Sequence, residues 1–187
     1  MSNYSWKELE QKFSELAPQM SGARMDVQYG SVPTRYDIVG CGNQTALDRY
    51  YSYSVIAGQK LLSSSNKSEF DKSEELRGEN NPVLFWLKVL REYSGKFVPD
   101  FIGNQTDFKT GESLGAIFVG RIQNIAEVSA IQCINFSLLF PDIVADETAK
   151  PHMNNSVKEE TFLNKYLIPI IVSVIASVIA GIILLLI

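Results

Sequence analysis

Histidine and cysteine, the residues that build most metal centres and disulfide frameworks, are almost absent from this chain. Its 187 residues include one histidine, His152, and two cysteines, Cys41 and Cys133. Two cysteines far apart in the sequence can be two buried thiols or one long-range disulfide, but they cannot form a disulfide framework. With a single histidine they also cannot supply a spaced zinc site. We therefore expect neither a metal centre nor a disulfide-stabilised fold.

Residues for acid–base or nucleophilic catalysis are equally scarce. His152 lies in the polar segment 141–161, and a catalytic histidine needs a fixed geometry that a mobile tether does not give. The adjacent carboxylates, which do not face each other on a helix, lie in charged stretches typical of a solvated surface. These pairs are Glu74–Glu75, Asp146–Glu147 and Glu159–Glu160. We expect a protein that is not an enzyme and that has no cofactor.

The chain also lacks a surplus of basic residues. It has 17 Lys and Arg against 21 Asp and Glu, a formal net charge of −4. Proteins that bind nucleic acid normally show a clustered excess of Lys and Arg, because phosphate contacts dominate the affinity. Nucleic acid is therefore not an expected partner.

Only one long stretch is free of charge, Leu167 to Ile187. About 20 apolar residues in a helix match the hydrocarbon thickness of a bilayer, so we predict a single transmembrane helix over 164–187. Residues 142–163 are polar and are expected to form a tether. Residues 1–141 are enough for one soluble domain with its own core. The lipid bilayer is thus an expected partner.

The sequence gives conflicting signals about which side of the membrane the domain faces. No apolar segment resembling a signal peptide lies near Met1, and Lys158 and Lys165 precede the charge-free stretch, which favours a tail-anchored protein with a cytoplasmic domain. Six glycosylation sequons favour the exterior side instead. They begin at Asn3, Asn43, Asn66, Asn104, Asn135 and Asn154. Because the run around Asn135 is strongly apolar, we expect no room for a glycan there.

Small residues recur along the predicted span at a spacing that favours helix packing. Close backbone approach along a strip of small residues is how membrane helices pair, since lipid provides little hydrophobic drive between them. The strip consists of Ser173, Ala176, Ser177, Ala180 and Gly181. It predicts self-association or pairing with another span.

Capping residues and apolar periodicity predict three main helices. Ser5 with Glu8 forms a capping-box pattern before a helix over Trp6–Leu16. A second helix is expected over Thr45–Leu62, and a third follows Asn81-Pro82 and continues through Tyr93. The charged connection between the last two, residues 62–80, can include a short helix.

Alternation of apolar and polar residues predicts antiparallel strands elsewhere, and hence a small α+β domain. The first two strands are joined as a hairpin, and the third contains Pro99, which places it at a sheet edge. The expected strands are Arg24–Tyr29, Arg35–Val39, Lys96–Ile102, Leu114–Ile125 and Ala130–Phe140. A helical interpretation of Leu114–Ile134 remains open, because short apolar runs do not fix their own period.

The segment after Val39 is the best candidate for a small-molecule site. A strand, the turn Gly40-Cys41-Gly42 and a helix follow one another as at the start of a dinucleotide-binding fold. Thr45 stands where the third glycine of that motif belongs, and no acidic residue follows on a second strand. The alternative is a simple glycine turn.

Three hypotheses of function follow. The first is a non-enzymatic, membrane-anchored assembly or adaptor protein, whose soluble domain binds a protein partner and whose membrane helix packs with other spans. The second is a nucleotide-sensing domain around Gly40, Gly42 and Thr45 that is coupled to the membrane helix. The third is a glycosylated ectodomain or a viral envelope component.

Overall fold

The computed structural model describes residues 4–142, which form a small α+β domain with an antiparallel sheet, as the sequence predicts. Within this range no helix combines the length and the apolar character needed to cross a membrane. The predicted span and its strip of small residues lie outside the described residues, as does nearly all of the tether. In chain order the elements are α1 (Trp6–Leu16), a 3-10 turn (Ala17–Met20), β1 (Arg24–Gly30), β2 (Arg35–Val39), α2 (Gln44–Leu62), α3 (Ser64–Phe70), α4 (Pro82–Tyr93), β3 (Val98–Thr106), β4 (Ser113–Gln123) and α5 (Ile125–Leu139).

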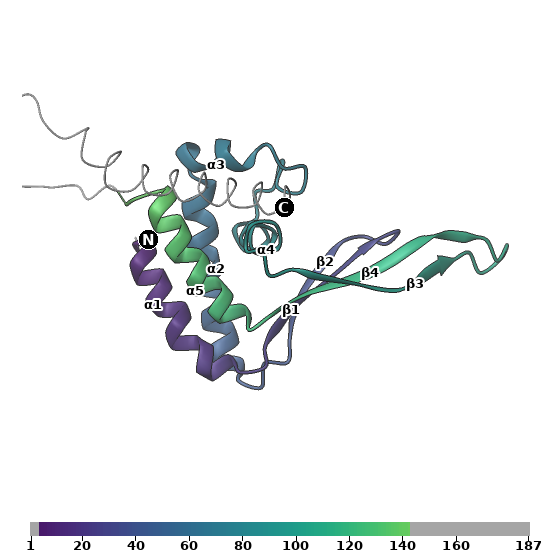
Figure 1. Ribbon diagram of the computed structural model, residues 1–187, viewed down its shortest axis with the longest axis horizontal. Helices are drawn as coiled ribbons and strands as arrows, with labels where there is room; N and C mark the ends of the chain where they lie inside the picture. Colours follow the sequence, from purple (N-terminus) through teal and green to yellow (C-terminus); the bar gives the residue numbers. More distant parts are fainter. Residues whose placement is uncertain (1–3, 143–187) are drawn as a thin grey trace, which may run out of the picture. The chain divides into compact units, whose positions relative to one another are not determined.

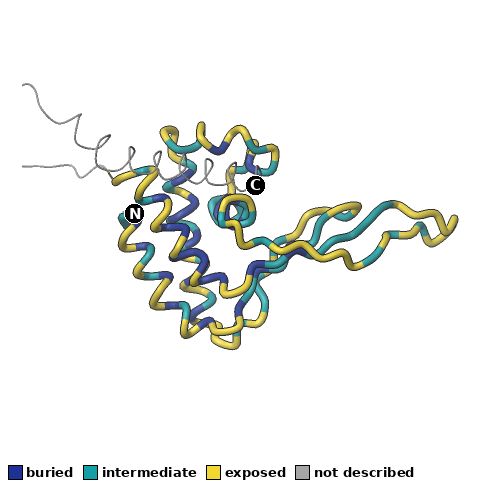
Figure 2. Tube along the Cα trace, in the orientation of Figure 1, coloured by how far each residue is buried: buried dark blue, intermediate teal, exposed yellow. Residues whose placement is uncertain are grey.

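The helices form one packed body, and the sheet extends away from it as an arm (Figure 1). The strand order is β2-β1-β4-β3, and all neighbouring strands are antiparallel. As Pro99 indicates, β3 lies at an edge of the sheet, where a missing backbone donor costs least. Buried residues concentrate in the helical body and at the base of the arm (Figure 2).

The predicted starts of α1 and α4 are confirmed, and α2 begins at Gln44, one residue before its predicted start. The Ser5 hydroxyl accepts a hydrogen bond from the Glu8 backbone, and the Glu8 carboxylate accepts one from the Ser5 N–H. The side chains of Asn43 and Asn81 cap α2 and α4 by accepting hydrogen bonds from the backbone N–H groups of Ala46 and Leu84. These contacts are local in sequence, so they can be recognised before any tertiary structure is known.

The predicted strand over Ala130–Phe140 is wrong, because this segment belongs to helix α5. Most of the helix circumference is apolar, so its polar residues mark no clear period and a strand fits the pattern equally well. The alternative that Leu114–Ile134 is helical is wrong for the residues up to Gln123, where β4 ends. It is correct for the residues from Ile125, which belong to α5. The change occurs at Asn124, whose left-handed backbone (φ 49°, ψ 53°) ends the strand and starts the helix.

Large aromatic side chains make up the centre of the helical body. The Phe13 and Trp86 rings stack with centroids 5.8 Å apart, and Phe136 on α5 packs against Trp6 at 5.5 Å. Such rings bury large apolar areas, so they contribute strongly to the hydrophobic stabilisation of the domain. The buried Tyr50 hydroxyl is paired with the Ser129 hydroxyl at 2.9 Å, so this polar pair is satisfied inside the core.

Two further expectations concern single residues. Cys41 and Cys133 are both free, so the disulfide alternative is wrong; Cys133 is buried and Cys41 is half-buried. Burial raises the pKa of the Cys133 thiol, which therefore remains neutral. Asn135 is exposed on α5, contrary to the expectation that its apolar surroundings leave no room. A helix alternates buried and exposed faces every few residues, so an apolar run does not bury each of its members.

A polar contact fastens the arm to the helical body. The Tyr36 hydroxyl on β2 donates a hydrogen bond to the Glu75 carboxylate and accepts one from the Arg91 guanidinium of α4 at 3.0 Å. Arg91 also pairs with Glu75 at 3.1 Å and lies over the rings of Tyr29 and Phe97, 4.7 and 5.1 Å from their centroids. These contacts combine charge-assisted hydrogen bonds with cation–π attraction, and they fix how the sheet leaves the helices.

Replacing Tyr36 with phenylalanine tests this contact. Burial, followed by the hydrogen bond to Glu75, raises the pKa of Tyr36 above its ordinary value of 10.0. Its contribution to stability is therefore complete below about pH 10 and falls as the pH rises further, because the unfolded chain ionises first. We expect Tyr36→Phe to lower the free energy of unfolding by about 1 kcal/mol near pH 8. Above pH 10 the stability of the variant should fall less steeply with pH than that of the unmodified chain. Urea unfolding at both pH values measures this. Tyr53→Phe, which keeps the ring that packs against Phe13, is the control that should change neither.

Candidate interaction surface

The outer part of the β3–β4 hairpin is a two-stranded ribbon. β1 accompanies β4 only as far as the Gly30–Ile117 pair, and β3 alone continues beside β4 to the Thr106–Ser113 pair. A ribbon of two strands is marginal in water unless one of its faces is covered. A register shift between Phe101 and Gly103 adds a bulge at this point, a feature that re-aims side chains on edge strands.

Large apolar side chains are exposed along this hairpin. We call this set the hairpin surface: Val98, Phe101, Ile102, Phe108 and Leu114. Four of them are 53–62% exposed, and Phe108, at the turn, is fully exposed at 106%. Single exposed apolar residues are common on proteins, but several on one projecting element are typical of an interaction site.

The turn that carries Phe108 is well ordered. The Asp107 carboxylate accepts hydrogen bonds from the backbone N–H groups of Lys109 and Thr110, at 2.7 and 2.9 Å. These bonds lower the pKa of Asp107, which remains ionised. The Asp107 backbone N–H also donates a hydrogen bond to the Glu112 carbonyl, and the Asp107 carbonyl accepts one from the Gly111 N–H. Phe108 is thus presented on a preformed turn, so little conformational entropy is lost when the turn binds.

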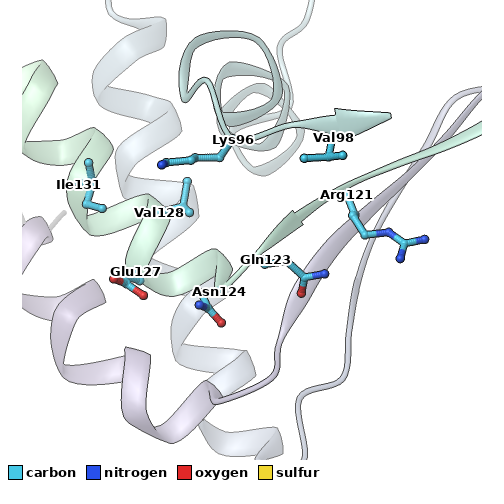
Figure 3. A pocket seen from close by; sticks show the side chains of 8 residues that line it. All are labelled: Lys96, Val98, Arg121, Gln123, Asn124, Glu127, Val128 and Ile131. Atoms are coloured by element: carbon cyan, nitrogen blue, oxygen red, sulfur yellow. The ribbon is translucent and has the colours of Figure 1, made fainter. Parts of the chain in front are cut away.

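An open groove of about 410 Å³ lies at the base of the arm, between β3, β4 and the start of α5 (Figure 3). We call it the base groove. Apolar contacts come from Val98 on β3 and from Val128 and Ile131 on α5, and Figure 3 shows Lys96 extending across the groove toward α5. Its complete lining is Lys96, Val98, Arg121, Gln123, Asn124, Glu127, Val128 and Ile131.

The charges of the base groove have no partners within residues 4–142. Lys96, Arg121 and Glu127 form no ion pair within 4.0 Å there, and the carboxylate of Asp26, on the neighbouring strand, is bound by Arg24 instead. The Arg121 Nε atom is buried, and no acceptor in this part of the chain binds it. A buried donor without an acceptor is costly, so an incoming acceptor is favoured here.

The glycine turn predicted as a nucleotide site is placed between an edge strand and α2. Gly40 has φ +77°, and an added Cβ would lie 2.6 Å from the Gly22 carbonyl oxygen, whereas Gly42 meets nothing within 4 Å. Backbone geometry thus explains Gly40 without a ligand. Thr45 is exposed, and Asn43 already accepts the Ala46 N–H that a phosphate would use. β2 belongs to an antiparallel sheet, unlike the first strand of a dinucleotide fold.

No cluster of three or more metal-ligating His, Cys, Asp or Glu side chains lies in the part of the chain that the structure describes. Comparisons with protein-family models, curated proteins and solved structures find no match for this chain. Neither the hairpin surface nor the base groove follows from a sequence motif. The available signal is weak: apolar residues occupy both faces of 101–102, and a phenylalanine stands in the polar turn at 108.

Proposed function

We propose that this chain is a non-enzymatic, membrane-anchored assembly or adaptor protein whose projecting β3–β4 hairpin binds a protein partner. The observation that carries the proposal is the hairpin surface, five large apolar side chains exposed along the β3–β4 hairpin and its turn. Burial of one such side chain contributes about 1.5–3 kcal/mol, so the set can supply the central contacts of an interface.

The membrane anchor in this proposal rests on the sequence of residues 167–187. The strip from Ser173 to Gly181 would pack the anchor beside other spans, and the soluble domain would face the cytoplasm. A domain held at a surface meets partners at a raised effective concentration, so even a modest hairpin contact would be sufficient.

The exposed sequons favour a second candidate, a glycosylated ectodomain. Asn43, Asn104 and Asn135 are exposed, and Asn104 lies on the hairpin itself. Asn66 is less suited, since its side-chain N–H group already donates to the Lys60 carbonyl and to the Ser63 hydroxyl. A mobility shift of the native protein after glycosidase treatment would favour this candidate over a cytoplasmic domain.

Paired substitutions on the hairpin test the proposed function. We expect Ile102→Ser with Phe108→Ser to reduce co-purification of cross-linked partners from the native membrane by about tenfold, because the exposed apolar anchors are lost. The free energy of unfolding should change by less than about 0.5 kcal/mol, since both residues are exposed.

The matched control is Leu138→Ser, which removes an apolar residue that is 79% exposed on α5, away from the hairpin. It should leave partner recovery unchanged. Equal recovery with the hairpin variant and the unmodified chain would show that the hairpin is not the contact element.

A further inference from the structure

We propose that the partner of the hairpin is a second copy of this chain, and that the tip of one copy, residues 107–112, binds in the base groove of the next. This inference rests on the proposed function and specifies the occupant of the groove. Its evidence is that one chain carries both an unburied aromatic residue on a preformed turn and an apolar groove with unpaired charges.

Shape supports the pairing of these two features. Phe108 contributes an aromatic ring at the end of a narrow ribbon, and the groove offers about 410 Å³ floored by Val98, Val128 and Ile131. A groove of this volume accommodates a phenylalanine ring with neighbouring turn atoms. An aromatic anchor seated in an apolar pocket and surrounded by polar contacts is the usual arrangement of an interface hot spot.

Charge supports it as well. The tip carries two acidic residues, Asp107 and Glu112, against Lys109, whereas the groove carries two basic residues, Lys96 and Arg121, against Glu127. Asp107 is engaged in its own turn, so Glu112 is the acidic group left to bind Lys96, which extends over the groove (Figure 3). Lys109 of the tip and Glu127 of the groove have opposite charges and would form a second pair. Such complementarity fixes the orientation of the tip and favours encounter.

The contact must be made between copies. The tip and the groove lie at opposite ends of β3, whose nine residues span about 30 Å as an extended strand. The hairpin therefore cannot fold back into the groove of its own chain (Figure 1). Because the two contact surfaces differ, each copy both provides a tip and accepts one.

Cysteine cross-linking between two differently tagged full-length copies in the membrane tests the inference. One copy carries Ser113→Cys beside the tip, the other carries Gln123→Cys at the edge of the groove, and a short bismaleimide joins thiols that lie close together. Both changes leave Phe108 and the apolar floor of the groove intact, and we expect a cross-linked pair only when both are present. Ser68→Cys on α3, exposed like Ser113, replaces Ser113→Cys as the positional control and should give none. Copies with one added cysteine control for the native Cys41 and Cys133.

A charge exchange tests the orientation. Glu112→Lys on the Ser113→Cys copy should reduce the yield of the cross-linked pair about fivefold, and Lys96→Glu on the Gln123→Cys copy should restore it. Yields that do not depend on these charges, or equal yields with Ser68→Cys, would overturn the tip-to-groove contact. If Ser113→Cys joins a different protein, or if no pair of copies forms, the inference is wrong. The proposed function is decided separately, by the partner recovery of the variant with Ile102→Ser and Phe108→Ser.

Discussion

Replacing Phe136 with alanine is expected to lower the free energy of unfolding by about 3–5 kcal/mol, enough to unfold a small domain partly. The Phe136 ring is 1% exposed and packs against the rings of Trp6, Phe70 and Trp86, with centroids 5.5, 5.8 and 6.2 Å away. Its removal leaves a cavity where α5 meets the helical body. Urea unfolding of the full chain in detergent, followed by the fluorescence of the buried tryptophans, measures the loss.

Leu138→Ala is the matched control. Leu138 lies two residues further along α5 and is 79% exposed, so its loss should cost less than about 0.5 kcal/mol. In a strand, residues 136 and 138 would point to the same face and would respond alike, whereas in a helix they point apart. Similar losses in the two variants would contradict the helical assignment of this segment.

Gly58→Ala is expected to lower the free energy of unfolding by about 2–3 kcal/mol, although alanine is the better helix former by about 1 kcal/mol. Gly58 lies where α2 crosses the start of α4, and a Cβ there would approach the Pro82 carbonyl oxygen to 1.9 Å. The obstacle is backbone, which cannot rotate away as a side chain can. The two helices must therefore separate, and contacts along their packed faces are lost.

Gln59→Ala, at the exposed neighbouring position, is the control for helix propensity. It should leave the midpoint of denaturation nearly unchanged, while Gly58→Ala lowers it. If Gly58→Ala stabilises the protein, the gain in helix propensity outweighs the steric clash at this position. The helices α2 and α4 would then not approach each other this closely.

The glycine turn and the base groove differ in whether their residues are close together in the sequence. Gly40, Gly42 and Thr45 lie close together in the sequence, so they could be recognised as a candidate nucleotide site. Whether the strand before them, β2, belongs to a parallel or an antiparallel sheet depends on its pairing with β1. The base groove combines residues 96–98 with 121–131, and nothing local links them. A surface built from distant segments has no spacing that a sequence motif could express.

The sequence by itself determined what depends on near neighbours. Caps at Ser5 and Asn81, the β1–β2 hairpin and the edge position that Pro99 requires are all confirmed, because each follows from the local sequence. The membrane span also depends only on a local apolar run, but it lies outside the described residues and stays a prediction. Tertiary structure alone decided that the apolar run after Asn124 is a helix, since only packing against α1 selects among periods that its composition allows. It also decided that apolar residues of the hairpin remain uncovered, because burial depends on which elements fold over a strand and not on the strand's own residues.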